Sequence, residues 1–185
     1  MLLSKDPLKQ ALRSKWYWPT MAQLFWRNKG EQVVMLPGSH EWDAEAAEAF
    51  LKIPRNDMIC VDRSRGVLSS FTQRFKGAIS YSGDVFEILE VLGESSPKNA
   101  IGLVDLDLCG CANPMVIRGL KQLCCNPAIA SGCAIGLTIC RRWKPDAEQE
   151  RMIKVTLAGC IEIDRRYYTN TLKSSHMVTM IYRLS

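Results

Sequence analysis

The sequence has no apolar run long enough to cross a membrane, and its 185 residues contain no repeat, low-complexity tract or long linker. A membrane-spanning helix needs about 20 predominantly apolar residues. The first residues, MLLSKDPLKQALRSKWYW, lack the apolar segment of a secretory signal peptide. We therefore expect a soluble, cytoplasmic protein with no membrane partner. The length suits one complete hydrophobic core and is too short for two ordinary domains.

Histidine is scarce, with two residues, and the eight cysteines follow no metal-binding spacing. Cys109-Gly-Cys111 and the adjacent pair Cys124-Cys125 are not Cys-x2-Cys knuckles, and no histidine lies near them in the sequence. Without an export signal, a disulfide framework is also disfavoured. We predict reduced and mostly buried thiols, no disulfides and no metal site. The net charge of +5 permits contact with nucleic acid but does not require it.

The N-terminal segment, roughly residues 5 to 28, has the apolar spacing of a helix, which Pro19 interrupts. We predict two short helices here, within a segment 1–30 that packs on a main domain 31–185. The cluster Trp-Tyr-Trp at 16–18 has two interpretations. Together with the nearby Lys15, Arg27 and Lys29 it could stack on bases or on a flat ligand. We favour the other interpretation, a helix packed over a sheet.

Beyond residue 30, short apolar runs alternate with segments of helical periodicity. The apolar runs are QVVML (32–36), MICVD (58–62), AISY (78–81), AIGLVD (100–105) and CAIGLTIC (133–140). Between them lie DAEAAEAFLK, SRGVLSSFTQRF, DVFEILEVL and NPMVIRGLKQLCC, and a fifth helix is expected near 145–158. Continuous apolar runs are typical of parallel strands buried on both faces. The alternation therefore predicts a doubly wound α/β fold.

The last part of the chain predicts a different connection. IEIDRRYYT and HMVTMIYRL are joined by NTLKSS, which leaves no room for a crossover helix. We expect an antiparallel hairpin of residues near 160–168 and 176–184 at the edge of a seven-stranded, mostly parallel sheet.

Turn-forming and acidic residues gather where the first four predicted strands end. These residues are Pro37-Gly38 after the first strand, Asp62 at the end of the second, Gly83-Asp84 after the third, and Asp105 and Asp107 on the fourth. In a doubly wound sheet, ligands bind at the carboxyl ends of the strands where the strand order reverses. The sequence therefore predicts one crevice shared by these side chains. Any single aspartate could instead be a helix cap, as Asp84 before VFEIL would be.

This arrangement resembles the class I S-adenosylmethionine-dependent methyltransferases over about residues 31–184. In that family the first loop holds the methionine end of the cofactor, an acidic residue ending the second strand binds the ribose, and an acidic residue after the third lies by the adenine. VVMLPGSHEWDAEA looks like the first loop, ICVDRS like the ribose motif, SYSGDVFEIL like the adenine motif and GLVDLDLCGCANP like the segment after the fourth strand. The antiparallel closing hairpin also matches. The resemblance implies S-adenosylmethionine as cofactor, bound by Pro37, Gly38, Ser39, Asp62, Arg63, Gly83, Asp84, Val85 and Asp105.

The chain departs from the family pattern in its loops. The glycine-rich first loop is reduced to Gly38, and Asn113-Pro114 is followed by Met115-Val116 instead of a second proline and an aromatic residue. Methylation of adenine N6 or cytosine N4 is therefore not supported. Carbon-5 methylation by Cys109 or Cys111 is disfavoured, because the family's Pro-Cys pairing is absent.

The catalytic candidates are Asp105 and Asp107, which would orient or deprotonate the acceptor. If both face the pocket, their repulsion would raise one pKa and make that carboxylate the better base. The alternative is that one of them caps a helix and that catalysis depends on positioning. For the acceptor we expect a cationic and aromatic rim, formed by Arg141, Trp143, Arg166 and Tyr168.

That rim fits RNA, DNA or a nucleotide, and an ordinary solvated edge is the alternative interpretation. A small-molecule acceptor and a homo-oligomer stay open. Two functions remain: an active methyltransferase, and a non-catalytic interaction module of the same fold that has lost cofactor binding.

Overall fold

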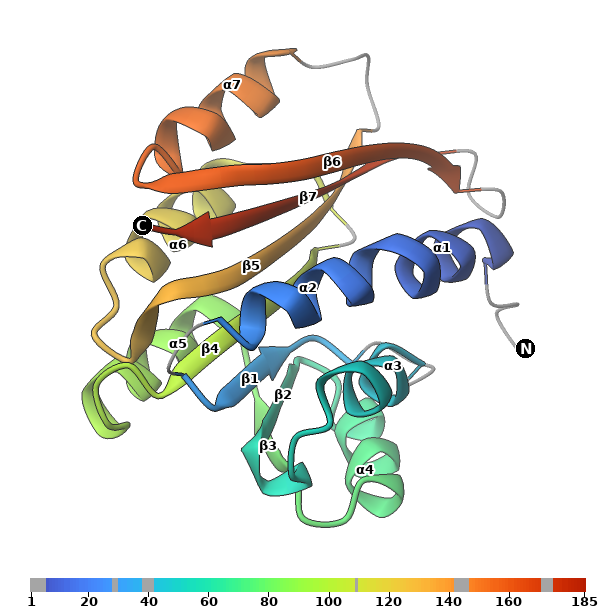
Figure 1. The fold of residues 1–185 in the computed structure, drawn as a ribbon, viewed down its shortest axis with the longest axis vertical. Helices are drawn as coiled ribbons and strands as arrows, with labels where there is room; N and C mark the ends of the chain where they lie inside the picture. Colours follow the sequence, from blue (N-terminus) through green and yellow to red (C-terminus); the bar gives the residue numbers. More distant parts are fainter. Residues whose placement is uncertain (1–5, 28–29, 38–41, 109, 142–146, 171–174) are drawn as a thin grey trace.

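The computed structural model describes residues 6–27, 30–37, 42–108, 110–141, 147–170 and 175–185 (Figure 1). Its centre is a seven-stranded sheet with the order β3-β2-β1-β4-β5-β7-β6. Strands β1 (Gln32–Met35), β2 (Met58–Asp62), β3 (Ile79–Ser82), β4 (Ile101–Leu108) and β5 (Ile129–Arg141) run parallel. The five strands lie at or within a few residues of the predicted apolar runs.

The closing hairpin is confirmed. β6 (Cys160–Asn170) pairs antiparallel with β7 (Ser175–Leu184), which pairs antiparallel with β5. Only β7 therefore runs against the other six strands. The fold is the predicted doubly wound α/β fold with a C-terminal antiparallel hairpin.

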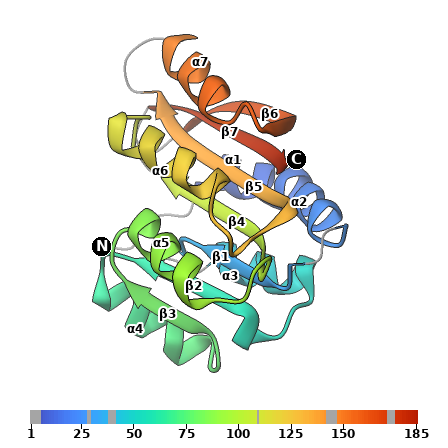
Figure 2. The same cartoon turned by 90° about the vertical axis from the view of Figure 1, so that its left-hand side faces the viewer.

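Helices cover both faces of the sheet (Figures 1 and 2). One face carries α2 (Trp18–Phe25), α3 (Trp42–Leu51) and α4 (Arg65–Arg74), and the other carries α5 (Val85–Ser95), α6 (Pro114–Cys124) and α7 (Ala147–Thr156). A short 3-10 turn, Arg55–Asp57, precedes β2. Alternating residues of a strand enter opposite cores: Val33 and Met35 pack toward α2 and α3, whereas Val34 packs toward α5 and α6. Burial on both faces explains the continuous apolar runs.

Two helices on the second face, α5 and α6, begin at side-chain caps that the sequence supplies. Asp84 accepts the Phe86 N–H at the start of α5, and Asn113 accepts the Val116 N–H at the start of α6. In the part of the chain that the structure describes, no helix combines the length and the apolar character needed to span a membrane.

The N-terminal segment contains two short α-helices, as predicted, but they are not interrupted at Pro19. α1 (Pro7–Leu12), a π-helical turn (Arg13–Tyr17) and α2 follow one another without a break. Pro19 lies in the first turn of α2, and the Trp18 N–H bonds to the Arg13 carbonyl across the wider turn. The predicted interruption at Pro19 was wrong because a proline in a first helical turn need not end a helix, and a π turn before it changes the spacing.

The Trp-Tyr-Trp cluster packs over the sheet, as favoured from the sequence. Tyr17 and Trp18 are completely buried, and Tyr17 lies against Gly136 in the middle of β5. A Cβ at Gly136 would overlap the Tyr17 hydroxyl. Glycine at this position is therefore what allows the N-terminal helix to approach β5.

Gly136→Ala is expected to lower the free energy of unfolding by about 1–3 kcal/mol, the usual cost of overpacking a core. Gly159→Ala is the matched control, because a Cβ there meets no heavy atom within 4 Å. Urea unfolding followed by circular dichroism measures both variants. Equal stability of the two would contradict the close packing of Tyr17 on β5.

Candidate active site

The carboxyl ends of β1 to β4 open into a cleft of about 690 Å³ between α5 and α6. Its lining includes Leu36 after β1, Asp62 at the end of β2, Gly83 and Asp84 after β3, and Asp107 and Leu108 on β4. The strand order reverses between β1 and β4, so this is the switch point where doubly wound sheets bind ligands. Of the predicted strand-end residues, Asp62, Gly83, Asp84 and Asp107 thus line one cleft, and Asp105 does not.

Asp62 presents a carboxylate to the cleft from the end of β2. Its Oδ1 accepts the Ser64 N–H at 2.7 Å, which orients the side chain. Within the described residues, its Oδ2 has no hydrogen-bond partner. One carboxylate oxygen is therefore positioned by the backbone, and the other is available to a ligand.

Both carboxylate oxygens of Asp84 accept hydrogen bonds from the protein, whereas only one of Asp62 does. Its Oδ1 accepts the Phe86 N–H at 2.9 Å, and its Oδ2 accepts a hydrogen bond from Arg63 Nη2 at 2.5 Å. The helix-cap interpretation of Asp84 is confirmed, although Asp84 also lines the cleft beside Val85. Arg63 lines the cleft as well and joins the ends of β2 and β3 through this ion pair.

The predicted methionine-binding loop is described only at its start. Leu36 lines the cleft and Pro37 is buried. Gly38 and Ser39 lie outside the described residues.

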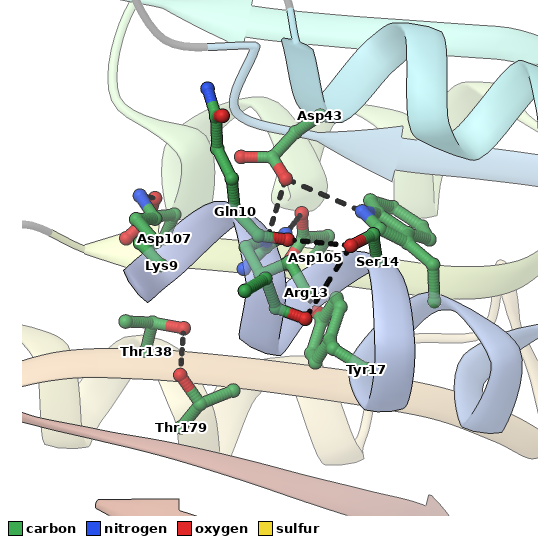
Figure 3. Close-up of polar contacts among 12 residues, drawn as sticks. Lys9, Gln10, Arg13, Ser14, Tyr17, Asp43, Asp105, Asp107, Thr138 and Thr179 are labelled. Atoms are coloured by element: carbon green, nitrogen blue, oxygen red, sulfur yellow. Dashed lines mark hydrogen bonds and ion pairs between the residues drawn. The ribbon is translucent and has the colours of Figure 1, made fainter. Parts of the chain in front are cut away.

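Asp105 occupies a different place from the one expected (Figure 3). It has no exposed surface, it does not line the cleft, and it points to the opposite face of the sheet from α5 and α6, under the N-terminal helix. Arg13 Nη2 donates to its Oδ2 at 2.5 Å, and the Tyr17 hydroxyl donates to its Oδ1. A carboxylate enclosed in this way cannot touch an acceptor, so we no longer place Asp105 among the cofactor-binding or catalytic residues.

Arg13 connects Asp105 to the first helix of the main domain. Its Nε donates to Asp43 of α3, whose carboxylate also accepts the Trp18 indole N–H at 3.3 Å. The guanidinium lies 4.1 Å from the centre of the Tyr17 ring, and the Arg13 side chain is 1% exposed. Asp43 is therefore part of a buried charged network that ties the N-terminal helix to α3 and β4.

Asp107 lies two residues further along β4, on the same face as Asp105 and at the edge of the cleft. Its Oδ2 accepts a hydrogen bond from Lys9 Nζ of α1. Its Oδ1 is buried and has no hydrogen-bond partner among the described residues. A buried carboxylate oxygen without a donor is costly, and at a cleft it is a position for a donor on a ligand.

The two aspartates also differ in pKa. Burial raises the pKa of Asp105 to about 6, against the opposing effect of Arg13. Burial would also raise the pKa of Asp107, but Lys9 and Arg13 outweigh it and hold that pKa below its usual value. The carboxyl with the raised pKa is thus the enclosed one, and the main cause is burial rather than repulsion between the two aspartates.

Of the predicted rim, two residues are described with their side chains. Arg166 is exposed, pairs with Asp164 at 3.3 Å and lies 5.5 Å from the ring centre of Trp16. Tyr168 is half-buried, and burial together with the charge of Asp107 raises its pKa. Both lie on β6 toward its carboxyl end, but neither lines the cleft. The Arg141 side chain and Trp143 lie outside what the structure describes.

The sequence-based prediction missed Lys9, Arg13 and Tyr17 as partners of the aspartates on β4. They follow one another at intervals of four residues and face one strand. That spacing is visible in the sequence and is the signal of one helix face.

No metal centre is found in the described part of the chain, where no group of three histidine, cysteine or acidic side chains is suitably placed. Seven of the cysteines lie in that part and form no disulfide there, and Cys109 lies outside it.

No family model matches the sequence, and a search of curated proteins finds no match. Solved structures do match. The N-methyltransferase NodS from Bradyrhizobium japonicum WM9 superposes with a TM-score of 0.62 at 10% identity, over 97% of this chain and 99% of that one. Fibrillarin from Aeropyrum pernix, solved with natively bound S-adenosyl-L-methionine, has a TM-score of 0.61 at 15% identity, over 84% of this chain and 67% of that one.

The chain has the class I methyltransferase fold. A third structure, the Methanococcus jannaschii fibrillarin pre-rRNA processing protein, agrees, with a TM-score of 0.57 at 11% identity, over 84% of this chain and 68% of that one. Identities this low establish a shared fold. The cofactor, the reaction and the acceptor depend on the residues of the site and not on the fold.

Proposed function

We propose that this class I methyltransferase-fold protein binds S-adenosylmethionine in the cleft and transfers its methyl group to an acceptor beside Asp107. The observation that carries the proposal is the convergence of Asp62, Asp84 and Asp107, from three different strands, on one cleft at the switch point. A. pernix fibrillarin, which binds this cofactor, has the same fold.

The residues of the cleft fit the cofactor. Asp62 would accept hydrogen bonds from the ribose hydroxyls, because one of its oxygens is oriented by Ser64 and the other has no partner in the described chain. Gly83, Asp84 and Val85, at the start of α5, would hold the adenine edge, with Arg63 fixing Asp84. Pro37, Gly38 and Ser39 remain the proposed loop for the methionine end.

The charge of the cleft also fits a cation. Its lining contains the carboxylates Asp62, Asp84, Glu87, Glu90 and Asp107 and the guanidinium groups Arg63 and Arg118. Arg63 pairs with Asp84, and Lys9 pairs with Asp107. The remaining charged groups of the lining are the carboxylates Asp62, Glu87 and Glu90 and the guanidinium of Arg118. The cleft is therefore net negative, although the whole chain carries +5. This lining disfavours a pyrophosphate and favours a positively charged ligand.

When bound, the cofactor supplies an activated methyl group on a sulfonium centre. The protein must then align an acceptor with that group, which requires positioning more than covalent chemistry. Asp107 suits this role, because its Oδ1 lacks a donor and its lowered pKa keeps it ionised. The same lowered pKa makes it a weak base, so we propose that Asp107 orients the acceptor rather than deprotonates it.

Nucleic acids, nucleotides and small molecules remain the acceptor classes. The exposed Arg166 beside Trp16, and the exposed Tyr167, supply cationic and aromatic groups near the carboxyl edge. The M. jannaschii structure is that of a pre-rRNA processing protein, and NodS is an N-methyltransferase. The second candidate function is an interaction module of the same fold without cofactor binding, which the single glycine of the first loop favours.

Calorimetric titration with S-adenosylmethionine and S-adenosylhomocysteine separates the two functions. Micromolar binding of both supports the enzyme. The absence of binding by either would leave the interaction module as the function.

The acidic lining adds a prediction about salt. S-adenosylmethionine carries one more positive charge than S-adenosylhomocysteine, and two net negative charges about 8 Å away stabilise that charge by about 1 kcal/mol in water. At low ionic strength we expect the sulfonium form to gain roughly fivefold in relative affinity, and high salt should remove most of this gain. A ratio of the two affinities that does not change with salt would contradict an acidic cofactor site.

A further inference from the structure

A pair of cysteines lies at the edge of the sheet opposite the cleft. Cys124 is the last residue of α6 and Cys160 is the first residue of β6, and they are 36 positions apart in the sequence. Their Sγ atoms lie 3.7 Å apart and share a hydrogen bond. Both residues are partly exposed. The two thiols are therefore adjacent in space without being bonded.

We infer that Cys124 and Cys160 form a peroxide-sensitive dithiol that closes into a disulfide between α6 and the β6–β7 hairpin. Adjacency carries this inference, since disulfide formation needs a second thiol within reach of the first. The inference is independent of the proposed methyl transfer.

The pKa shifts of the two thiols indicate which thiol reacts with the oxidant first. The hydrogen bond from Cys160 lowers the pKa of Cys124, whereas the same bond and burial raise the pKa of Cys160. Cys124 is thus the better source of thiolate, which is the nucleophilic form. The third nearby thiol, Cys133, is fully buried and its pKa is raised by that burial, so it stays protonated.

The oxidation balances with a hydroperoxide as the oxidant. The Cys124 thiolate attacks one peroxide oxygen, an S–O bond forms, the O–O bond breaks, and the leaving oxygen takes up a proton as water or alcohol. Cys160 then attacks the Cys124 sulfenic sulfur, an S–S bond forms and the S–O bond breaks with release of water. The two thiols lose two electrons and two protons, which the peroxide accepts.

Cys125 supplies the matched control. It is adjacent to Cys124 in the sequence and more exposed, but it has no recorded thiol contact in the described chain. If exposure alone decided the chemistry, Cys125 would react first. If adjacency decides it, Cys125 is not needed for disulfide formation.

The test uses the full reduced chain, treated with hydrogen peroxide and then counted for free thiols after denaturation. We expect the parent and Cys125→Ser to lose two thiols at the same rate and to regain them with dithiothreitol. Cys124→Ser and Cys160→Ser should form no intramolecular disulfide, and Cys160→Ser should accumulate a sulfenic acid that dimedone traps at Cys124. Fragmentation mass spectrometry of the oxidised parent locates the bond even if a serine variant folds poorly. A bond at Cys125, or disulfide formation that persists in Cys124→Ser or Cys160→Ser, would overturn the inference, as would a parent that forms no disulfide.

Discussion

Arg13→Met is expected to be among the most destabilising single changes in this protein, with a loss of about 3–5 kcal/mol in the free energy of unfolding. The guanidinium is almost fully buried and bonds Asp43 and Asp105. Methionine keeps much of the volume and removes the charge, so two carboxylates lose the cation between them. Because small domains are stable by only about 5–15 kcal/mol, this loss is a large fraction of the total.

Two further variants test the cause of that loss. Arg166→Met removes an exposed arginine from a pair with Asp164 and should cost no more than about 1 kcal/mol. Adding Asp105→Asn to Arg13→Met removes one of the two unpaired charges and should recover part of the stability. Urea unfolding by circular dichroism compares all of them. If Arg13→Met unfolds at the same urea concentration as Arg166→Met, the buried network does not hold the N-terminal helix in place.

Asp62→Ala is expected to weaken S-adenosylhomocysteine binding at least tenfold. The change would remove the proposed charge-assisted pair of hydrogen bonds to the ribose, each worth about 1.5–3 kcal/mol, and ~1.4 kcal/mol is one decade in affinity. The fold should remain, because Asp62 is partly exposed at the end of β2. Isothermal titration calorimetry measures the affinity, and a thermal melt checks the fold.

The controls for Asp62→Ala come from the turn before the same strand and from the same cleft. Asp57→Ala alters an aspartate at the other end of β2, away from the cleft lining, and should leave affinity unchanged. Asp62→Asn keeps an acceptor for the Ser64 N–H but loses the charge. It therefore shows how much of the lost affinity comes from the ligand contact and how much from disturbing the turn at Ser64. Asp84→Asn should weaken binding less than Asp62→Ala, since an amide still hydrogen-bonds. A folded Asp62→Ala protein that binds like the parent would refute the assignment of this cleft.

The strands and the strand-end cleft could be predicted from the sequence because their signals are local. Apolar runs such as MICVD and GLVD mark strands buried on both faces, and a polar residue directly after such a run must lie near the carboxyl edge. Asp62 and Asp84 were found in this way and they do line the cleft. The closing hairpin was predicted from the length of one connection, which is also a local property.

The role of Asp105 could not be predicted in this way. Period-two alternation shows that Asp105 and Asp107 share a face, but it does not show which element covers that face. The answer depends on the docking of a helix from the other end of the chain, with Arg13 and Tyr17 over Asp105 and Lys9 over Asp107. An aspartate at a strand end is therefore a candidate for catalysis only until its neighbours in space are known.

The N-terminal helix has a consequence for how the protein is made. Its Trp16 donates a hydrogen bond to Asp164, a partner 148 residues later in the chain. At about 5–20 residues per second, a ribosome needs on the order of 10 to 30 seconds to synthesise that interval. For most of this time Tyr17 and Trp18 have been synthesised, while β4 and β5, on which they pack, are missing or incomplete. The nascent chain thus exposes the aromatic surface of Tyr17 and Trp18 early and buries it late, so this helix reaches its final packing only near the end of synthesis.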